Sequence, residues 1–367
     1  LASDTTPKIQ DTVQTSVRWK MKLQSVTFDK VAFAMKMPQD SMYLAARIQE
    51  AKMRDGNIDL YTQRYEAGLL SITNSSLTYI QGDTVPLPGF DPSYIVLNDL
   101  NIELDSVMNQ KINVAGFIRE LSFKERSGLQ VSSLTGKVRM DSTQVYVPDL
   151  TLTTPYSNLK LQAEGAVTSF RKDAEGQLKA LLNASLGKKD IVLLAGQIPE
   201  SFKQNYPDKP ISIQVNIDGN TDKLYIRTLD ARLPDAFKLT ANGTAEQIMD
   251  SLRRSGEIKL KLETDSLDFV TAMLDSTGKQ TFRLPNNMLL EGDATLAAGL
   301  YRAQLNLTEG KGNVDLTAYY QALKKAYGVD VEIRNLQLAN FLPSDSLQHI
   351  SATLHAEGQG TGPQGCL

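Results

Sequence analysis

The sequence predicts an all-β protein built mainly of antiparallel strands, with a few short helices. Apolar and polar residues alternate through most of the chain, as in Ile211–Gly219 and Ile258–Glu263. Because successive side chains of a strand point to opposite faces, each such segment is a strand with one apolar and one polar face. Many of these segments lie only a few residues apart, which favours antiparallel meanders over helical crossovers.

The N-terminal part of the chain shows a less regular strand pattern than the rest. We expect a turn at Asp55–Asn57, because Asp, Gly and Asn tolerate positive φ. The strands expected here are Val17–Phe28, Val31–Met37, Tyr43–Met53, Leu69–Ile80 and Ile95–Leu104.

Later strands alternate more strictly. A second turn is predicted at Asp218–Asn220, between two of them. The expected strands include Val138–Met140, Val145–Val147, Leu159–Gly165, Ile211–Gly219, Leu224–Ile226, Leu239–Ala241, Ile258–Glu263, Tyr301–Leu307 and Val329–Arg334.

Three short helices are predicted, each expected to cap or plug one end of a sheet. Asp190 is a candidate N-cap for residues 191–195, and Asp265 is one for residues 266–274. Residues 244–252 also carry apolar side chains at helical spacing. Residues 318–327 favour a helix by composition, but they join two alternating segments, so we interpret them as the tip of a hairpin.

A quasi-repeat recurs along the chain, in which a short alternating strand ends in glycine. It indicates modules that stack along one axis. The copies are Leu159–Gly165, Phe237–Gly243, Met288–Gly292 and Ile350–Gly358.

The apolar faces of these strands need a cover, and three short helices are too few to supply it. Either the faces pack on each other in a sandwich or barrel, or the sheet curls and leaves a trough for an amphipathic ligand. The low aromatic content of 7% favours an aliphatic trough. The residue pattern leaves both alternatives open.

Composition argues against several functional classes. The net charge of −3 is unlike that of nucleic-acid-binding proteins, which usually carry a basic stripe. The only cysteine is Cys366, and the only histidines are His349 and His355. The chain therefore lacks a disulfide framework, a cysteine-built zinc site and a histidine-rich centre. No phosphate-binding loop or nucleophile motif occurs, so we expect no enzyme activity, no cofactor and no metal.

Two segments carry a family resemblance. Leu121–Leu129 reads LSFKERSGL, and Val147–Leu159 reads VPDLTLTTPYSNL. Together with Asn340–Leu347 and the strand at Ile350–Gly360, they resemble the TamB-like branch of the AsmA family, in the form found in Bacteroidetes-type envelopes. The likeness covers about residues 95–362, and its motifs are short and structural.

The resemblance implies an elongated, curled sheet of the β-taco or β-groove type in a periplasmic protein. Such proteins are anchored in the inner membrane by an N-terminal helix, which this sequence lacks. They carry phospholipids toward the outer membrane or support outer-membrane biogenesis with a barrel partner. We therefore interpret the chain as a section of a larger rod, with a β section at 1–110, a groove section at 111–362 that continues it, and a tail at 363–367.

The candidate site is the set of inward aliphatic side chains, whose role would be contact with phospholipid acyl chains. The alternative function is a β-sandwich adhesin or a carbohydrate-binding or structural module with a closed core, for which Trp19, Tyr319, Tyr320 and Tyr327 are the visible aromatic candidates. The predicted lining residues are Leu159, Leu161, Ile211, Ile213, Val215, Ile217, Ile258, Leu260, Leu262, Leu305, Leu307, Val329, Val331 and Ile333.

Overall fold

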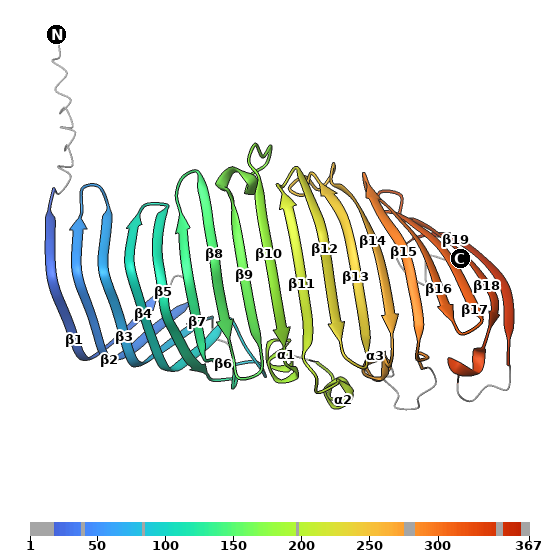
Figure 1. Cartoon of the computed structure of the whole chain (residues 1–367), viewed down its shortest axis with the longest axis horizontal. Coiled ribbons are helices and arrows are strands. Elements are labelled where there is room, and N and C mark those ends of the chain that lie inside the picture. The colour runs from blue at the N-terminus through green and yellow to red at the C-terminus, as the bar shows by residue number, and fades with distance from the viewer. Residues whose placement is uncertain are drawn as a thin grey trace, which may run out of the picture.

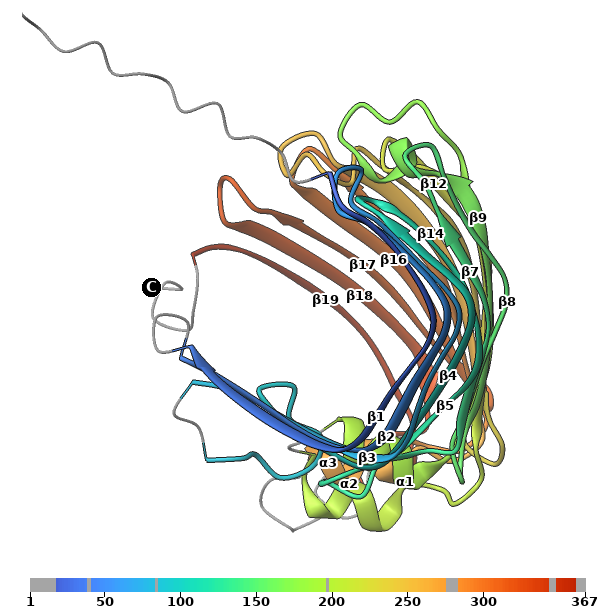
Figure 2. The same cartoon turned by 90° about the vertical axis from the view of Figure 1, so that its left-hand side faces the viewer.

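The computed structural model describes residues 18–37, 41–82, 85–195, 198–274, 283–342 and 348–360. These residues form one antiparallel sheet of 19 strands, drawn out along one axis (Figure 1). Seen along that axis, the sheet curls into an open curve (Figure 2). The predicted all-β class, the elongated antiparallel sheet and the few short helices are confirmed.

The strands follow one another through the sheet, and nearly all pair with their neighbours in sequence. The one exception is that β5 pairs with both β6 and β7. Within the described residues β1 pairs only with β2, and β19 only with β18, so the sheet has two free edges and does not close. A sandwich would require a second sheet, which the described residues do not form.

The strand bounds show where each hairpin turns. The first nine strands are β1 (Lys20–Met37), β2 (Met42–Asp59), β3 (Arg64–Gln81), β4 (Tyr94–Gln110), β5 (Asn113–Glu125), β6 (Gln130–Val131), β7 (Ser133–Met140), β8 (Gln144–Thr153) and β9 (Asn158–Ala166). The others are β10 (Leu178–Leu186), β11 (Ile211–Gly219), β12 (Lys223–Leu233), β13 (Phe237–Glu246), β14 (Ser255–Thr264), β15 (Met288–Ala297), β16 (Leu300–Glu309), β17 (Gly312–Gln321), β18 (Ala326–Leu336) and β19 (Ile350–Gln359).

The first strands are long and bent (Figure 2). Pairing of β1 with β2 is interrupted opposite Asp55 and at Lys30, two residues with positive φ. The apolar alternation of β1 skips a residue at the same two points, which explains the irregular pattern of the N-terminal sequence.

The turn predicted at Asp55–Asn57 is wrong, because these residues form a bend inside β2. β4 and β5 pair across the section boundary expected after residue 110.

Three helices lie inside the curve, at one end of the strands (Figure 2). They are α1 (Lys188–Leu194), α2 (Glu200–Asn205) and α3 (Asp268–Leu274). None of the helices in the described part of the chain is long and apolar enough to cross a bilayer.

The helix predictions are correct in part. The helices expected near residues 191–195 and 266–274 are present as α1 and α3. Asp190 is not the N-cap of α1, because Gly187 holds that position, and Asp265 lies before the start of α3. The helix expected at residues 244–252 is absent, because its first residues extend β13 and the rest form a turn. The hairpin tip predicted at residues 318–327 is confirmed.

The helices pack over a small apolar core at their end of the sheet. Phe269 of α3 packs edge-on against the rings of Phe202 and Tyr206, 5.5 and 5.3 Å away. Leu233, at the end of β12, is the largest fully buried side chain in this core. We call this cluster the helical plug; its buried members are Tyr206, Leu233, Ala236, Leu267, Phe269, Met288, Leu336 and Phe341.

Candidate functional site

The strand register places apolar residues in continuous rows across the sheet from β8 to β19. One row crosses the middle of these strands and contains only apolar residues and one glycine: Leu150, Leu161, Leu182, Val215, Leu229, Ala241, Leu260, Gly292, Leu305, Leu316, Val331 and Leu354. The row on its helical side runs through Leu152, Leu159, Ala184, Ile213, Ala231, Leu239, Leu262, Leu290, Leu307, Val314, Ile333 and Ala352.

Two further rows lie toward the end of the strands that is remote from the helices. The first contains Val147, Ala163, Ala180, Ile217, Ile226, Gly243, Ile258, Ala294, Ala303, Ala318, Val329 and Ala356. The second contains Val145, Gly165, Leu178, Gly219, Leu224, Ala245, Gly256, Leu296, Tyr301, Tyr320, Tyr327 and Gly358. We call the surface made by these four rows the apolar face. It contains no charged residue.

Bulges keep the rows in phase. The β12 strand has one extra residue against both neighbours between Ile226 and Leu229, and β8 has one between Val147 and Leu150. One extra residue reverses the face to which each following side chain points. In these two strands it keeps the apolar residues before and after the bulge on the same face.

All fourteen predicted lining residues lie on this face. Thirteen belong to the four rows, and Ile211 lies one step beyond them, opposite Leu186. None of the fourteen is buried and none is fully exposed. Ile211, Leu307 and Ile333 pack against the helical plug, so these three partly close the helical end of the face.

The helices show which side of the sheet is apolar. Ile191 of α1, Phe202 of α2 and Val270 of α3 pack against the same cluster as Leu307 and Ile333 of the apolar face. Since the helices lie inside the curve, the apolar face lines its concave side (Figure 2).

The opposite, convex face is polar. The row that alternates with the middle apolar row reads Thr151, Lys160, Asn183, Gln214, Asp230, Thr240, Lys261, Glu291, Asn306, Asp315, Glu332 and Thr353. Lys261 lies 3.1 Å from Glu263 and 3.3 Å from Glu291, and these contacts raise the pKa of its ammonium group. Such exposed ion pairs keep this face hydrated and add little stability.

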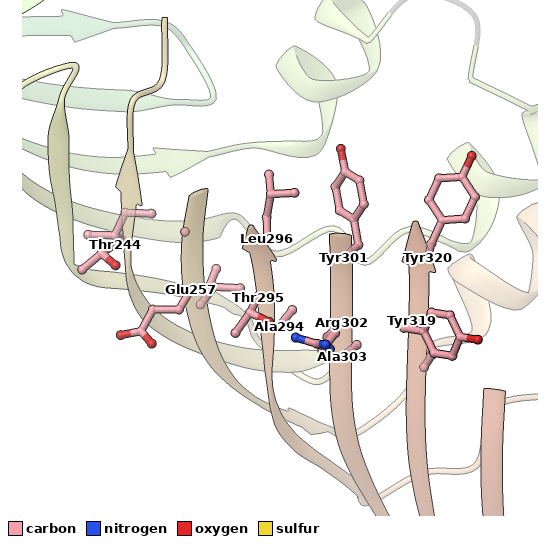
Figure 3. Close-up of a pocket in the computed structure, with 14 residues that line it drawn as sticks. Thr244, Glu257, Ala294, Thr295, Leu296, Tyr301, Arg302, Ala303, Tyr319 and Tyr320 are labelled. Carbon is pink, nitrogen blue, oxygen red and sulfur yellow. The ribbon is translucent and has the colours of Figure 1, made fainter. Parts of the chain in front are cut away.

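A pocket of about 440 Å³ opens on the apolar face where β14 to β17 meet. Its floor is formed by small residues such as Gly256, Ala294 and Ala303. Leu296, Tyr301 and Tyr320 stand side by side at one end and point the same way (Figure 3). The pocket can hold an apolar chain below a rim of tyrosines.

The tyrosine rim was not predicted as part of the site. The rings of Tyr301 and Tyr320 are 6.1 Å apart, and Tyr327 follows them in the same row. The alternation of residues 301–307 contained this signal, because it places Tyr301 on the face of Leu305. Of the other aromatic candidates, Tyr319 alternates with Tyr320 along β17 and is also among the residues that line the pocket (Figure 3), and Trp19 lies beside the start of β1.

The polar residues considered in the sequence are dispersed. His355 of β19 is exposed beside Asp330, and His349 is exposed just before β19. Cys366 lies outside the described residues. Among those residues, no three His, Cys, Asp or Glu side chains group as metal ligands.

The comparisons with known proteins add no homologue. No protein-family model, no curated protein and no solved structure matches the chain.

Proposed function

We propose that the protein is a non-enzymatic carrier that holds phospholipid acyl chains on its apolar face. In this proposal it forms part of a periplasmic bridge of the TamB-like type, which moves lipids or supports outer-membrane biogenesis. The polar headgroups of the bound lipids remain at the open, hydrated side of the curved sheet. The observation that carries the proposal is the unbroken apolar face, which crosses β8 to β19 without a charged residue and which the described residues cover only at its helical end.

The energetics favour an apolar occupant. Fully burying a Leu, Ile or Val side chain is worth roughly 1.5–3 kcal/mol, and the side chains of this face are only half-buried. Covering them yields on the order of 1 kcal/mol each. A soluble protein rarely leaves so large an apolar surface bare. Acyl chains fit a smooth aliphatic lining, and the concave shape leaves room for them.

The test is to identify lipid bound to the protein after gentle purification, by native mass spectrometry and by lipid extraction. Ile213→Asp places a carboxylate on the apolar face, and Ser212→Asp places the same charge on the next residue of β11, on the polar face beside Arg232. Desolvating a carboxylate against acyl chains is costly, so we expect Ile213→Asp to reduce bound phospholipid about tenfold. Ser212→Asp is expected to leave it unchanged.

Two results would count against the proposal. One is a folded wild-type protein that carries no lipid and sediments as a tight dimer, since a neighbouring chain then covers the face. The other is equal loss of lipid in both variants, with both still folded by circular dichroism.

A further inference from the structure

The strand ends remote from the helices carry a series of exposed apolar side chains. The loop after β9 exposes Phe170, the loop after β13 exposes Met249 and Leu252, and the turn after β17 exposes Leu323. Leu252 and Leu323 are 78% and 85% exposed, which is more than most residues on the apolar face itself. These loops all lie at the strand ends opposite the helices (Figure 1), and the turn after β17 stands apart from the other two (Figure 2). We call this end of the strands the tip edge.

The loops of the tip edge are ordered by hydrogen bonds. The amide of Thr221 donates to Ser169 O at 3.0 Å, and the amide of Ile248 donates to Thr221 O at 2.8 Å. These bonds tie the loops after β9, β11 and β13 into one platform. Asp250 Oδ1 accepts the amide of Leu252 at 3.0 Å, so the exposed leucine sits on a fixed turn.

The turn that carries Leu323 is held in the same way. The amide of Ala322 donates to Gly299 O at 2.9 Å, and the amide of Gly360 donates to Lys325 O at 2.9 Å. The neighbouring β15–β16 turn and the end of β19 therefore support this tip. Exposed apolar side chains on turns that backbone hydrogen bonds hold in place indicate a surface that binds an apolar partner.

Basic residues flank these apolar tips. Arg171 follows Phe170, Arg254 follows the turn of Leu252, and Lys324 and Lys325 follow Leu323. Within the described part of the chain, no carboxylate forms an ion pair with any of these four side chains. The whole chain has a net charge of −3, whereas the β17–β18 turn carries two lysines and no acidic residue.

The N-terminal strands continue the pattern along the same edge. Trp19 is exposed before β1, between Arg18 and Lys20, and Tyr61 is exposed in the β2–β3 turn. Lys20 pairs with Asp59 at 3.1 Å. The Arg18 guanidinium lies 5.2 Å from the ring centre of Tyr61. Ile112 is exposed in the β4–β5 turn, beside Lys111.

We propose that the tip edge docks on the surface of an anionic lipid bilayer. Exposed Leu, Met, Ile and Phe side chains enter the boundary between headgroups and acyl chains, while Lys and Arg contact anionic headgroups. Trp and Tyr are the aromatic residues that favour this interface. The tyrosine rim of the apolar face, with Tyr301 and Tyr320, lies one step behind the tips, at the depth where such rings settle.

Docking along this edge would also present the end of the apolar face to the bilayer. Lipid could then pass between membrane and apolar face at the tyrosine rim. This consequence rests on the proposed function, whereas docking itself depends only on the tips. The two can therefore fail separately.

The experiment measures binding of the full chain to vesicles by flotation. One set of vesicles contains equal parts of phosphatidylcholine and phosphatidylglycerol, and the other contains phosphatidylcholine alone. Leu323→Ser is compared with Val85→Ser, because Val85 is also 85% exposed but lies in the β3–β4 loop at the other end of the strands. Lys324→Glu is compared with Lys311→Glu in the β16–β17 turn, which also lies at that other end.

We expect the wild type to bind the anionic vesicles and to lose binding at high salt. Leu323→Ser should weaken binding about fivefold, and Lys324→Glu about tenfold. Both controls and Ile213→Asp should bind like the wild type. The proposal is overturned if the wild type does not float with anionic vesicles, or if Val85→Ser and Lys311→Glu weaken binding as much as their partners at the tip edge.

Discussion

His355 Nδ1 lies 2.5 Å from Asp330 Oδ1, across the pair formed by β18 and the edge strand β19. The hydrogen bond to Asp330 raises the pKa of His355 above its usual range, and the charge of the carboxylate adds to this effect. Protonated His355 therefore helps to hold β19 against the sheet. Both side chains are exposed, so the effect is confined to the edge and is screened by salt.

The pH dependence of β19 follows from this contact. The pKa of His355 is higher in the folded protein than in the unfolded chain, where it is about 6.5. The stabilisation of β19 is therefore complete below about pH 6.5 and is lost as the pH rises through the pKa of His355 in the folded protein. We expect amide exchange protection factors in β19 to fall across that range, relative to those of the central strands. Asp330→Asn should weaken this pH dependence, with Glu357, 3.7 Å from His355 Nε2, still in place. An unchanged pH response of β19 in this variant would contradict the assignment.

The carboxylate of Asp190 fixes the first turn of α1 to the β8–β9 turn. Asp190 is 3% exposed and accepts hydrogen bonds from the hydroxyls of Thr154 and Ser157, the latter at 2.5 Å. Asp190→Ala leaves both buried hydroxyls without their acceptor, so we expect a loss of about 2–3 kcal/mol in urea unfolding. Asp208→Ala removes an exposed carboxylate that pairs with Lys188, and should change stability by less than about 1 kcal/mol. Equal losses would show that the buried contact does not form in solution.

The contrast between the helical plug and the apolar face is also testable. Leu233 is 1% exposed in the plug, so Leu233→Ala creates a cavity and should cost about 3 kcal/mol. Leu305 is only half-buried on the apolar face, so Leu305→Ala should cost about 1 kcal/mol in delipidated protein. Thermal unfolding of both variants measures the difference. A Leu305→Ala variant as damaged as Leu233→Ala would mean that the face is sealed.

Gly292 marks a close approach of two strands. A Cβ at this position would lie 2.1 Å from the carbonyl oxygen of Gln304 on the adjacent strand. Gly292→Ala must therefore displace backbone and should cost roughly 1–3 kcal/mol. Gly116→Ala is the control, because a Cβ there meets its nearest atoms at 3.8 Å. Chemical denaturation that finds the two variants equally stable would rule out this close approach.

Alternation in the sequence was sufficient to predict the central part of the fold and the candidate lining. From β9 to β19 the strands are short, and five of their ten connections are turns of two to four residues. The alternation of apolar and polar residues therefore shows directly which face each side chain occupies. Residues 318–327 were assigned correctly because the register of their flanking strands outweighed local helix propensity.

The failures came from residues whose environment is set by tertiary structure. Ile248, Met249 and Leu252 have helical spacing, but they extend into solvent from a turn instead of packing on a sheet. Asp55–Asn57 has turn chemistry, yet it serves as a bend inside a long strand. The tip edge could not be predicted, because it depends on which loops share an end of the sheet, and that follows only from a complete strand count.

The meander has one consequence for how such a protein can change in length. Almost every strand contacts only its sequence neighbours, so stability is approximately a sum of local terms, as in repeat proteins. Removing a hairpin such as β16–β17 would leave the flanking strands antiparallel and their water-avoiding sides aligned. Removing one strand alone would reverse the direction of everything after it. Lengthening or shortening in evolution should therefore proceed two strands at a time.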